Sequence, residues 1–147
     1  MNNDPIILAL EEQVDCYRRL SKLAEVQHEH VTHSHTEGLL EVLGRRQEVL
    51  VQLNRLEAIV SPAKRRWGEY LTEIDETRRA AAEALLLETR RLLQQITESD
   101  QRDALVLQQR KLNLGKQIQQ ASSARQINRN YAAAAYGAPK PRMNITQ

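Results

Sequence analysis

Apolar residues recur along most of the chain at intervals of three, four and seven positions, the spacing of amphipathic α-helices. A first helix is predicted from residue 5 to about residue 33, with Asp4 as its N-cap and Pro5 at the first helical position. A second helix begins near Thr36, a capping residue, and Gly38 allows a tight turn there. Its wide apolar face comprises Leu39, Val42, Leu43, Val49, Leu50, Leu53, Leu56 and Val60. The short polar connection predicts that these two helices form an antiparallel hairpin.

The apolar pattern is interrupted at Ser61-Pro62. Proline inside a helix removes a hydrogen bond, whereas Ser-Pro is a favourable start for a new helix, so we expect a short helix over residues 62–72. A long third helix follows over roughly residues 76–129. Its apolar positions seven residues apart are Leu86, Leu93, Leu107, Leu114 and Ala121.

Asp100 is the only polar residue in that seven-residue series, and Asp103 follows three positions later. Two carboxylates on one helix face could in principle ligate something. Their polar neighbours Ser99, Gln101 and Arg102 instead favour a hydrated patch, or a break that sets the register of the seam.

Abundant Glu, Gln, Arg, Leu and Ala favour helix, and with no Phe and only five aromatic residues the chain suits thin helix-on-helix seams. We therefore predict an all-α fold: an antiparallel helical hairpin, a short helix and a long third helix, forming a coiled-coil-like three-helix bundle. This helical domain covers residues 1–129. Residues 130–147, with Gly137 and two prolines, are predicted to be a flexible, disordered basic tail.

Cys16 is the only cysteine, so no internal disulfide can form, which fits a reducing cytosol; a half-buried spectator thiol is expected. The first residues lack the basic region of a signal peptide, and no apolar run reaches the length of a membrane span. A cytoplasmic protein without membrane insertion is the resulting expectation.

Charge is unevenly spread along the chain. Residues 1–99 carry 13 basic and 17 acidic groups, whereas residues 100–147 carry 8 basic and 2 acidic groups. No Asp or Glu follows Asp103. Such a basic end suits an acidic protein surface or nucleic acid. Arg pairs recur among glutamates throughout, so the basic run at residues 64–66 before Trp67 indicates a solvated face, and a nucleic-acid partner is not expected.

All four histidines, His28, His30, His33 and His35, lie around the first connection. Imidazole is a common zinc or nickel ligand, but this spacing points His28 and His30 to different helix faces and no Cys joins them. We predict a solvated polar turn and no metal site. The sequence shows no phosphate loop, nucleophile elbow or paired catalytic carboxylates, so neither enzymatic activity nor a cofactor is expected.

The order of these segments resembles the FlgN family of flagellar type III export chaperones. The matching features are Glu-Glu-Gln-Val at residues 11–14, Leu-Leu-Glu-Val-Leu at 39–43, Leu-Leu-x-x-Ile at 92–96, Tyr131, and Tyr136-Gly137. Ser61-Pro62, the histidine turn and the two aspartates of the long helix depart from the family pattern.

The resemblance implies a cytosolic protein that binds the C-terminal region of hook–filament junction proteins (FlgK- or FlgL-like) and docks on the export gate component FlhA. Carried over to this chain, the expected client-binding residues are Leu107, Leu114, Ile118, Ile127 and Tyr131, flanked by the cations Lys111 and Arg125. Tyr136 is expected to contact either the gate or the client. Independently of the resemblance, an apolar stripe that outruns the first two helices suits an amphipathic helix from a partner.

The main alternative is a structural coiled-coil protein that buries the same stripe by self-association and has no client. A basic regulator of nucleic acid is a more remote reading.

Overall fold

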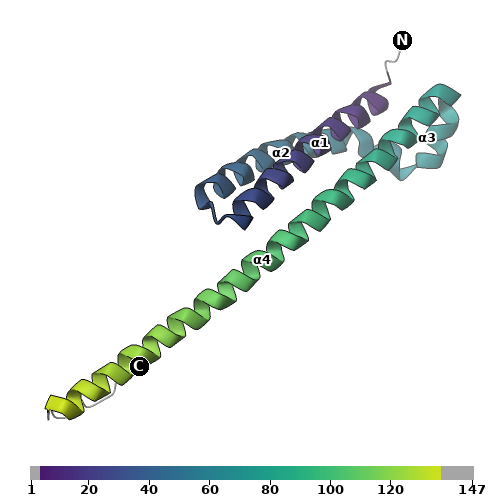
Figure 1. Ribbon diagram of the computed structural model, residues 1–147. Coiled ribbons are helices and arrows are strands. Elements are labelled where there is room, and N and C mark those ends of the chain that lie inside the picture. Colours follow the sequence, from purple (N-terminus) through teal and green to yellow (C-terminus); the bar gives the residue numbers. More distant parts are fainter. Residues whose placement is uncertain (1–3, 137–147) are drawn as a thin grey trace. The chain divides into compact units, whose positions relative to one another are not determined.

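The computed structural model describes residues 4–136, with side chains as far as Ala134, and every regular element in that range is an α-helix. The helices are α1 (Pro5–Thr32), α2 (Thr36–Arg65), α3 (Trp67–Glu73) and α4 (Glu76–Tyr136) (Figure 1). The all-α prediction is confirmed. None of the described helices is long and apolar enough to cross a membrane.

Aspartate side chains cap two of the helices. Asp4 accepts a hydrogen bond from the backbone N–H of Ile6 at 2.8 Å, and Asp75 accepts one from the N–H of Arg78 at 2.8 Å. Each bond satisfies a donor that has no partner inside the first turn. α2 starts differently, because Thr36 is already helical and His35, at the N-cap, makes no side-chain capping bond. The predicted cap at Thr36 is therefore wrong.

The turn between α1 and α2 is made by Ser34, which takes a positive φ of 57°. The N–H of His35 then bonds the carbonyl of His30 at 2.9 Å. Gly38, predicted to allow a tight turn, lies within the first turn of α2 instead. A Cβ at Gly38 would overlap the His30 ring, so a larger residue there must displace that side chain, whereas the backbone conformation at Gly38 does not itself require glycine.

Pro62 does not start a helix as predicted; α2 continues through it to Arg65. Proline near a helix end removes one hydrogen bond, and the burial of Val60 and Ala63 on either side keeps that turn packed. The chain leaves helical geometry at Arg66 (φ −128°, ψ 49°), so the short helix begins at Trp67 and ends at Glu73.

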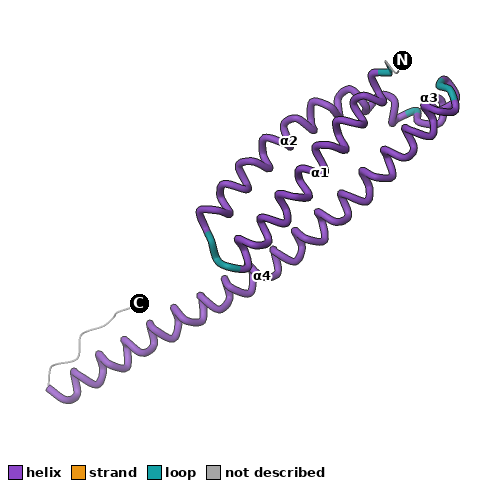
Figure 2. Tube along the Cα trace, turned by 45° about the horizontal axis from the view of Figure 1, so that its top comes forward, coloured by secondary structure: helices purple, strands orange, loops and turns teal. Residues whose placement is uncertain are grey.

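One apolar core joins all four helices within the first of two units into which the chain divides, the unit that ends at Val106. α1 and α2 pack side by side along their length (Figure 2). The buried core cluster comprises Ile7, Ala9, Leu10, Cys16, Leu20, Val49, Leu53, Leu56, Val60, Ala63, Tyr70, Ala82 and Ile96. Aliphatic side chains dominate it, as the composition predicts. Cys16 is fully buried rather than half-buried, and burial raises the pKa of its thiol, which makes the thiol unreactive.

The second unit begins at Leu107 and contains the rest of α4. The helix runs to Tyr136, so residues 130–136 are helical where a disordered tail was predicted. Four consecutive alanines in this stretch, at 132–135, have the highest helix propensity of any residue and account for the extension. The remainder of the predicted tail, residues 137–147, lies outside the described range.

Candidate binding surface

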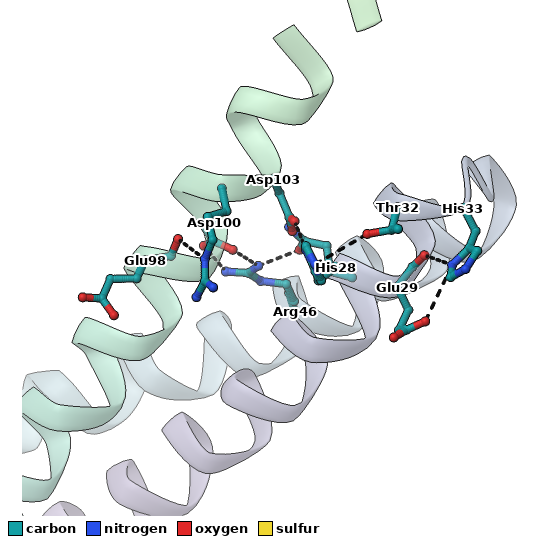
Figure 3. Close-up of polar contacts among 10 residues, drawn as sticks. His28, Glu29, Thr32, His33, Arg46, Glu98, Asp100 and Asp103 are labelled. Carbon is teal, nitrogen blue, oxygen red and sulfur yellow. Dashed lines mark hydrogen bonds and ion pairs between the residues drawn. The ribbon is translucent and has the colours of Figure 1, made fainter. Parts of the chain in front are cut away.

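A buried carboxylate joins α4 to α1 near the end of the first unit. Asp103 is only 2% exposed, and its two oxygens have different partners (Figure 3). One accepts a hydrogen bond from Gln27 Nε2 at 3.0 Å, and the other lies 2.7 Å from His28 Nδ1. Because a carboxylate oxygen can only accept here, His28 Nδ1 carries the hydrogen. Each oxygen of Asp103 is therefore satisfied by a side chain of α1.

Arg46 of α2 completes this polar layer. Its guanidinium forms a two-pronged pair with Asp100 of α4, with both N–O distances at 2.8 Å, and also donates to Gln27 Oε1 at 2.6 Å. The hydrogen bond to Asp100 raises the pKa of Arg46 further above its ordinary value, against the opposing effect of burial. Three helices are thus tied together through side chains that satisfy one another.

Of the two interpretations offered for Asp100 and Asp103, the structure supports the break in the seam that sets register. A hydrated patch would leave both carboxylates in water, whereas Asp103 is buried and Asp100 is paired with Arg46. A buried polar layer of this kind penalises any sliding of α4 along α1 and α2, because a shift would leave Asp103 without partners.

Beyond this layer the character of α4 changes. In the second unit nearly every described side chain is exposed, including Leu107 (42%), Leu114 (57%) and Ile118 (62%). Residues seven and four positions apart share one side of a helix, so these three form one apolar strip, here named the α4 apolar face. The predicted cations Lys111 and Arg125 follow the same spacing and lie on the same side.

The structure separates two of the predicted client-binding residues from the others. Ile127 comes nine residues after Ile118, which is about half a turn away around a regular helix. Tyr131, four residues further on, lies near Ile127 and is 76% exposed. One straight partner helix cannot cover both groups, so client contact at Ile127 and Tyr131 stays a prediction that would need a second contact surface. Tyr136 ends α4, and its side chain lies outside the described part.

The four histidines have different partners, although His28, His33 and His35 are all exposed. His28 bonds Asp103, and His33 Nδ1 donates to the carbonyl of Glu29 at 2.9 Å. The His33 and His35 rings stack with centroids 5.7 Å apart. Within residues 4–136, no three His, Cys, Asp or Glu side chains are arranged to hold one metal ion. His28 lies within α1, is 48% exposed and also joins the polar layer through Asp103, whereas His33 and His35 are exposed, in agreement with the predicted solvated turn.

Sequence reasoning missed Gln27 and Arg46 as partners of the two aspartates. Both occupy apolar seam positions: Gln27 stands between Ala24 and Val31 in the repeat of the first helix, and Arg46 stands between Val42 and Val49 in that of the second. The available signal was a polar residue at a seam position of each helix. Burying a polar side chain costs free energy unless it is hydrogen-bonded, so such residues are expected to pair with one another.

No protein-family model matches the chain, and no curated protein or solved structure is significantly similar to it. The function is therefore argued from these surfaces and their chemistry.

Proposed function

We propose that this chain is a cytoplasmic export chaperone of the FlgN type. In this proposal it binds the C-terminal region of FlgK- or FlgL-like hook–filament junction proteins and delivers them to the export gate component FlhA. The observation that carries the proposal is the α4 apolar face: Leu107, Leu114 and Ile118 stand largely exposed on one side of a helix. An amphipathic helix from a client is the natural cover for such a strip.

Burial of this face supplies affinity. Each of its three aliphatic side chains is roughly half exposed, so covering each one contributes on the order of 1 kcal/mol before ordering costs. Spacings of seven and four residues match the anchors that one helical ligand presents along its length. The surface suits a helical client better than an extended one, because an isolated helix offers no sheet edge to extend.

Charge favours an acidic client. No acidic residue follows Asp103 in the sequence, while Lys111 and Arg125 lie on the same side of α4 as the apolar face. Cations at the rim of an apolar contact attract an oppositely charged partner and speed its association. The expected client segment therefore combines an apolar stripe with flanking Asp or Glu.

The two units have separate tasks in this proposal. The first unit serves as the scaffold, a coiled-coil-like three-helix bundle of α1, α2 and the first part of α4 with α3 packed at its end. The second unit covers the client's apolar face and so keeps the client soluble without a catalytic step or a cofactor. Release of the client then requires only that the export gate component compete with the client for the surface of the second unit.

Ile127 and Tyr131 are assigned a separate contact. Because they lie on the other side of α4 from Leu114 and Ile118, they remain accessible while a client helix occupies the α4 apolar face. We assign this side, continuing toward Tyr136, to the export gate or to a second segment of the client.

The test is a calorimetric titration of the full chain with a purified C-terminal fragment of a hook–filament junction protein. Leu114→Ala with Ile118→Ala should weaken binding by about 100-fold, since central apolar anchors each contribute more than 1 kcal/mol. Leu112→Ala is the matched control: Leu112 is 56% exposed in the same unit but faces away from Leu114. Equal affinity of the double variant and the control, with helicity intact, would overturn the proposal.

A further inference from the structure

Three exposed cations share one side of α4 with the α4 apolar face and are here named the basic clamp: Lys111, Arg125 and Arg129. Lys111 comes four residues after Leu107 and seven before Ile118. Arg125 follows Ile118 by seven residues. Arg129 follows Ile118 by eleven residues, which is three turns of a helix to within about 20°. Arg129 therefore joins the two cations already placed on this side.

The remaining cations of the described second unit are placed differently. Lys116 follows Leu114 by two residues, about 200° around the helix, so it lies on the other side of α4. Arg110 borders the α4 apolar face but is only partly exposed. The members of the basic clamp have no ion-pair partner within residues 4–136, because no acidic residue follows Asp103 in the sequence. Their charges are thus available to a partner.

The basic clamp brackets an apolar centre. Between Lys111 and Arg125 the same side of α4 carries Leu114, Ile118 and Ala121. Lys111 and Arg125 are 14 residues apart, which is about 21 Å along the helix axis. Arg129 lies 18 residues after Lys111, which is five full turns or about 27 Å. Read along its length, this side is cationic, then apolar, then cationic.

This order of charges selects among the possible occupants. A second copy of the same side would set cations against cations in either orientation, which disfavours self-association here. Nucleic acid would bring phosphates against the aliphatic centre, where no cation can neutralise them. An amphipathic helix that is apolar in the middle and acidic at both ends satisfies the apolar and the cationic parts together.

We propose that the basic clamp selects a client helix of about five turns that carries Asp or Glu at both ends of its apolar stripe, and that Arg129 is one of the residues that determine this specificity. The proposal rests on the proposed function, since it describes the client that the α4 apolar face receives. The aliphatic side chains supply most of the affinity, and the clamp rejects segments whose ends are neutral or basic.

The first test uses a labelled synthetic helical peptide of roughly 22 residues, long enough to reach both ends of the clamp. It carries leucines along its middle and Glu at both ends, and fluorescence anisotropy at low salt reports its binding to the full chain. The same peptide with Gln at both ends should bind about tenfold more weakly, because three exposed charge pairs are lost. Equal affinity of the two peptides would overturn the proposal.

Arg129→Glu and Lys116→Glu form a matched pair, because both reverse one exposed cation of the same helix. Arg129→Glu should weaken binding of the Glu-ended peptide about fivefold, and Lys116→Glu by less than about twofold. The difference should vanish near 1 M salt, where charges are screened within about 3 Å. Equal losses in the two variants would mean that only the total charge of the helix matters, and would overturn the proposal.

A charge swap tests for direct contact. A peptide with Lys at both ends should bind the triple variant Lys111→Glu, Arg125→Glu, Arg129→Glu more tightly than it binds the unaltered chain. Failure of this reversal with helicity intact, or duplex DNA that competes with the Glu-ended peptide at equal concentration, would overturn the proposal.

The outcome is separable from that of the proposed function. If Leu114→Ala with Ile118→Ala weakens binding of the junction-protein fragment but Arg129→Glu does not, the proposed function stands and the clamp is refuted. If that fragment does not bind at all while the Glu-ended peptide binds in the manner expected above, the proposed client is wrong and the selection of acidic-ended helices stands.

Discussion

His28 and Asp103 are 75 residues apart in the chain, yet His28 Nδ1 lies 2.7 Å from the Asp103 carboxylate. With Gln27 on the other oxygen, this contact fixes where α4 lies against α1. Asp103→Ala would leave the buried Gln27 amide without its acceptor and would also remove the acceptor of His28, whose side chain is 48% exposed. We expect unfolding free energy to fall by about 2 kcal/mol, measured by urea denaturation.

Glu98→Ala is the control for that change, because Glu98 is exposed on the same stretch of α4. Its effect should stay within about 0.5 kcal/mol, as for ordinary surface substitutions. If Asp103→Ala were equally mild, the polar layer would contribute little, and its role in setting register would have to be abandoned.

Two glycines of α2 should respond differently to alanine. Gly44→Ala places a methyl group in open space and should stabilise the helix by up to about 1 kcal/mol, since alanine has the higher helix propensity. The added methyl group of Gly38→Ala would overlap the His30 ring and must displace it, so we expect a smaller gain than at Gly44 or none. Thermal melts at one low protein concentration compare the two; a gain at Gly38 equal to that at Gly44 would show that His30 moves freely.

The raised pKa of Tyr70 predicts that the folded protein loses stability at high pH. Burial, and then its hydrogen bond to Asp4 at 2.8 Å, raise the pKa of Tyr70 above its usual value near 10. The folded state therefore favours the protonated phenol, and this contribution is complete below pH 10 and is lost as pH rises beyond it. Tyr70→Phe should lower the melting temperature at pH 8 but flatten its decline between pH 9 and 11. Tyr131→Phe, at an exposed side chain, should follow the wild-type curve; a Tyr70→Phe curve parallel to it would contradict the assignment.

Lys111 and Arg125 should influence how fast a client binds more than how long it stays. Reversing both to Glu should slow association with the client fragment and reduce the dependence of that rate on salt, because rim charges act mainly on encounter. Dissociation should change little. Stopped-flow measurements at two ionic strengths decide this, and an effect confined to dissociation would place these side chains inside the contact.

The sequence predicted the helices well because periodicity and caps are local signals. Asp4 acts as the predicted cap, and the wide apolar face of the second helix could be recognised from the spacing of its apolar residues. Local signals misjudged Pro62, because α2 continues through it to Arg65 with Val60 and Ala63 buried on either side. They also could not divide the apolar face into a buried and an exposed row, because that division depends on where the other helices pack.

The candidate site was predicted only in part for a similar reason. Leu114 and Ile118 lie on one exposed side of α4, as their four-residue spacing indicates. Ile127 follows Ile118 by nine residues, which is about half a turn of a regular helix, so it lies on the other side. The partners of Asp103 come from another helix, and pairing across helices is not encoded in the spacing of any one of them.

Amide hydrogen exchange on the free and client-saturated chain tests the central claim most directly. An isolated stretch of exposed helix opens often, and a bound partner slows that opening. We expect the largest gain in protection between Leu107 and Ala121, with little change in α1 and α2. Protection that increases only in α1 and α2, or nowhere on α4, would contradict the assignment of the α4 apolar face as the client-binding surface.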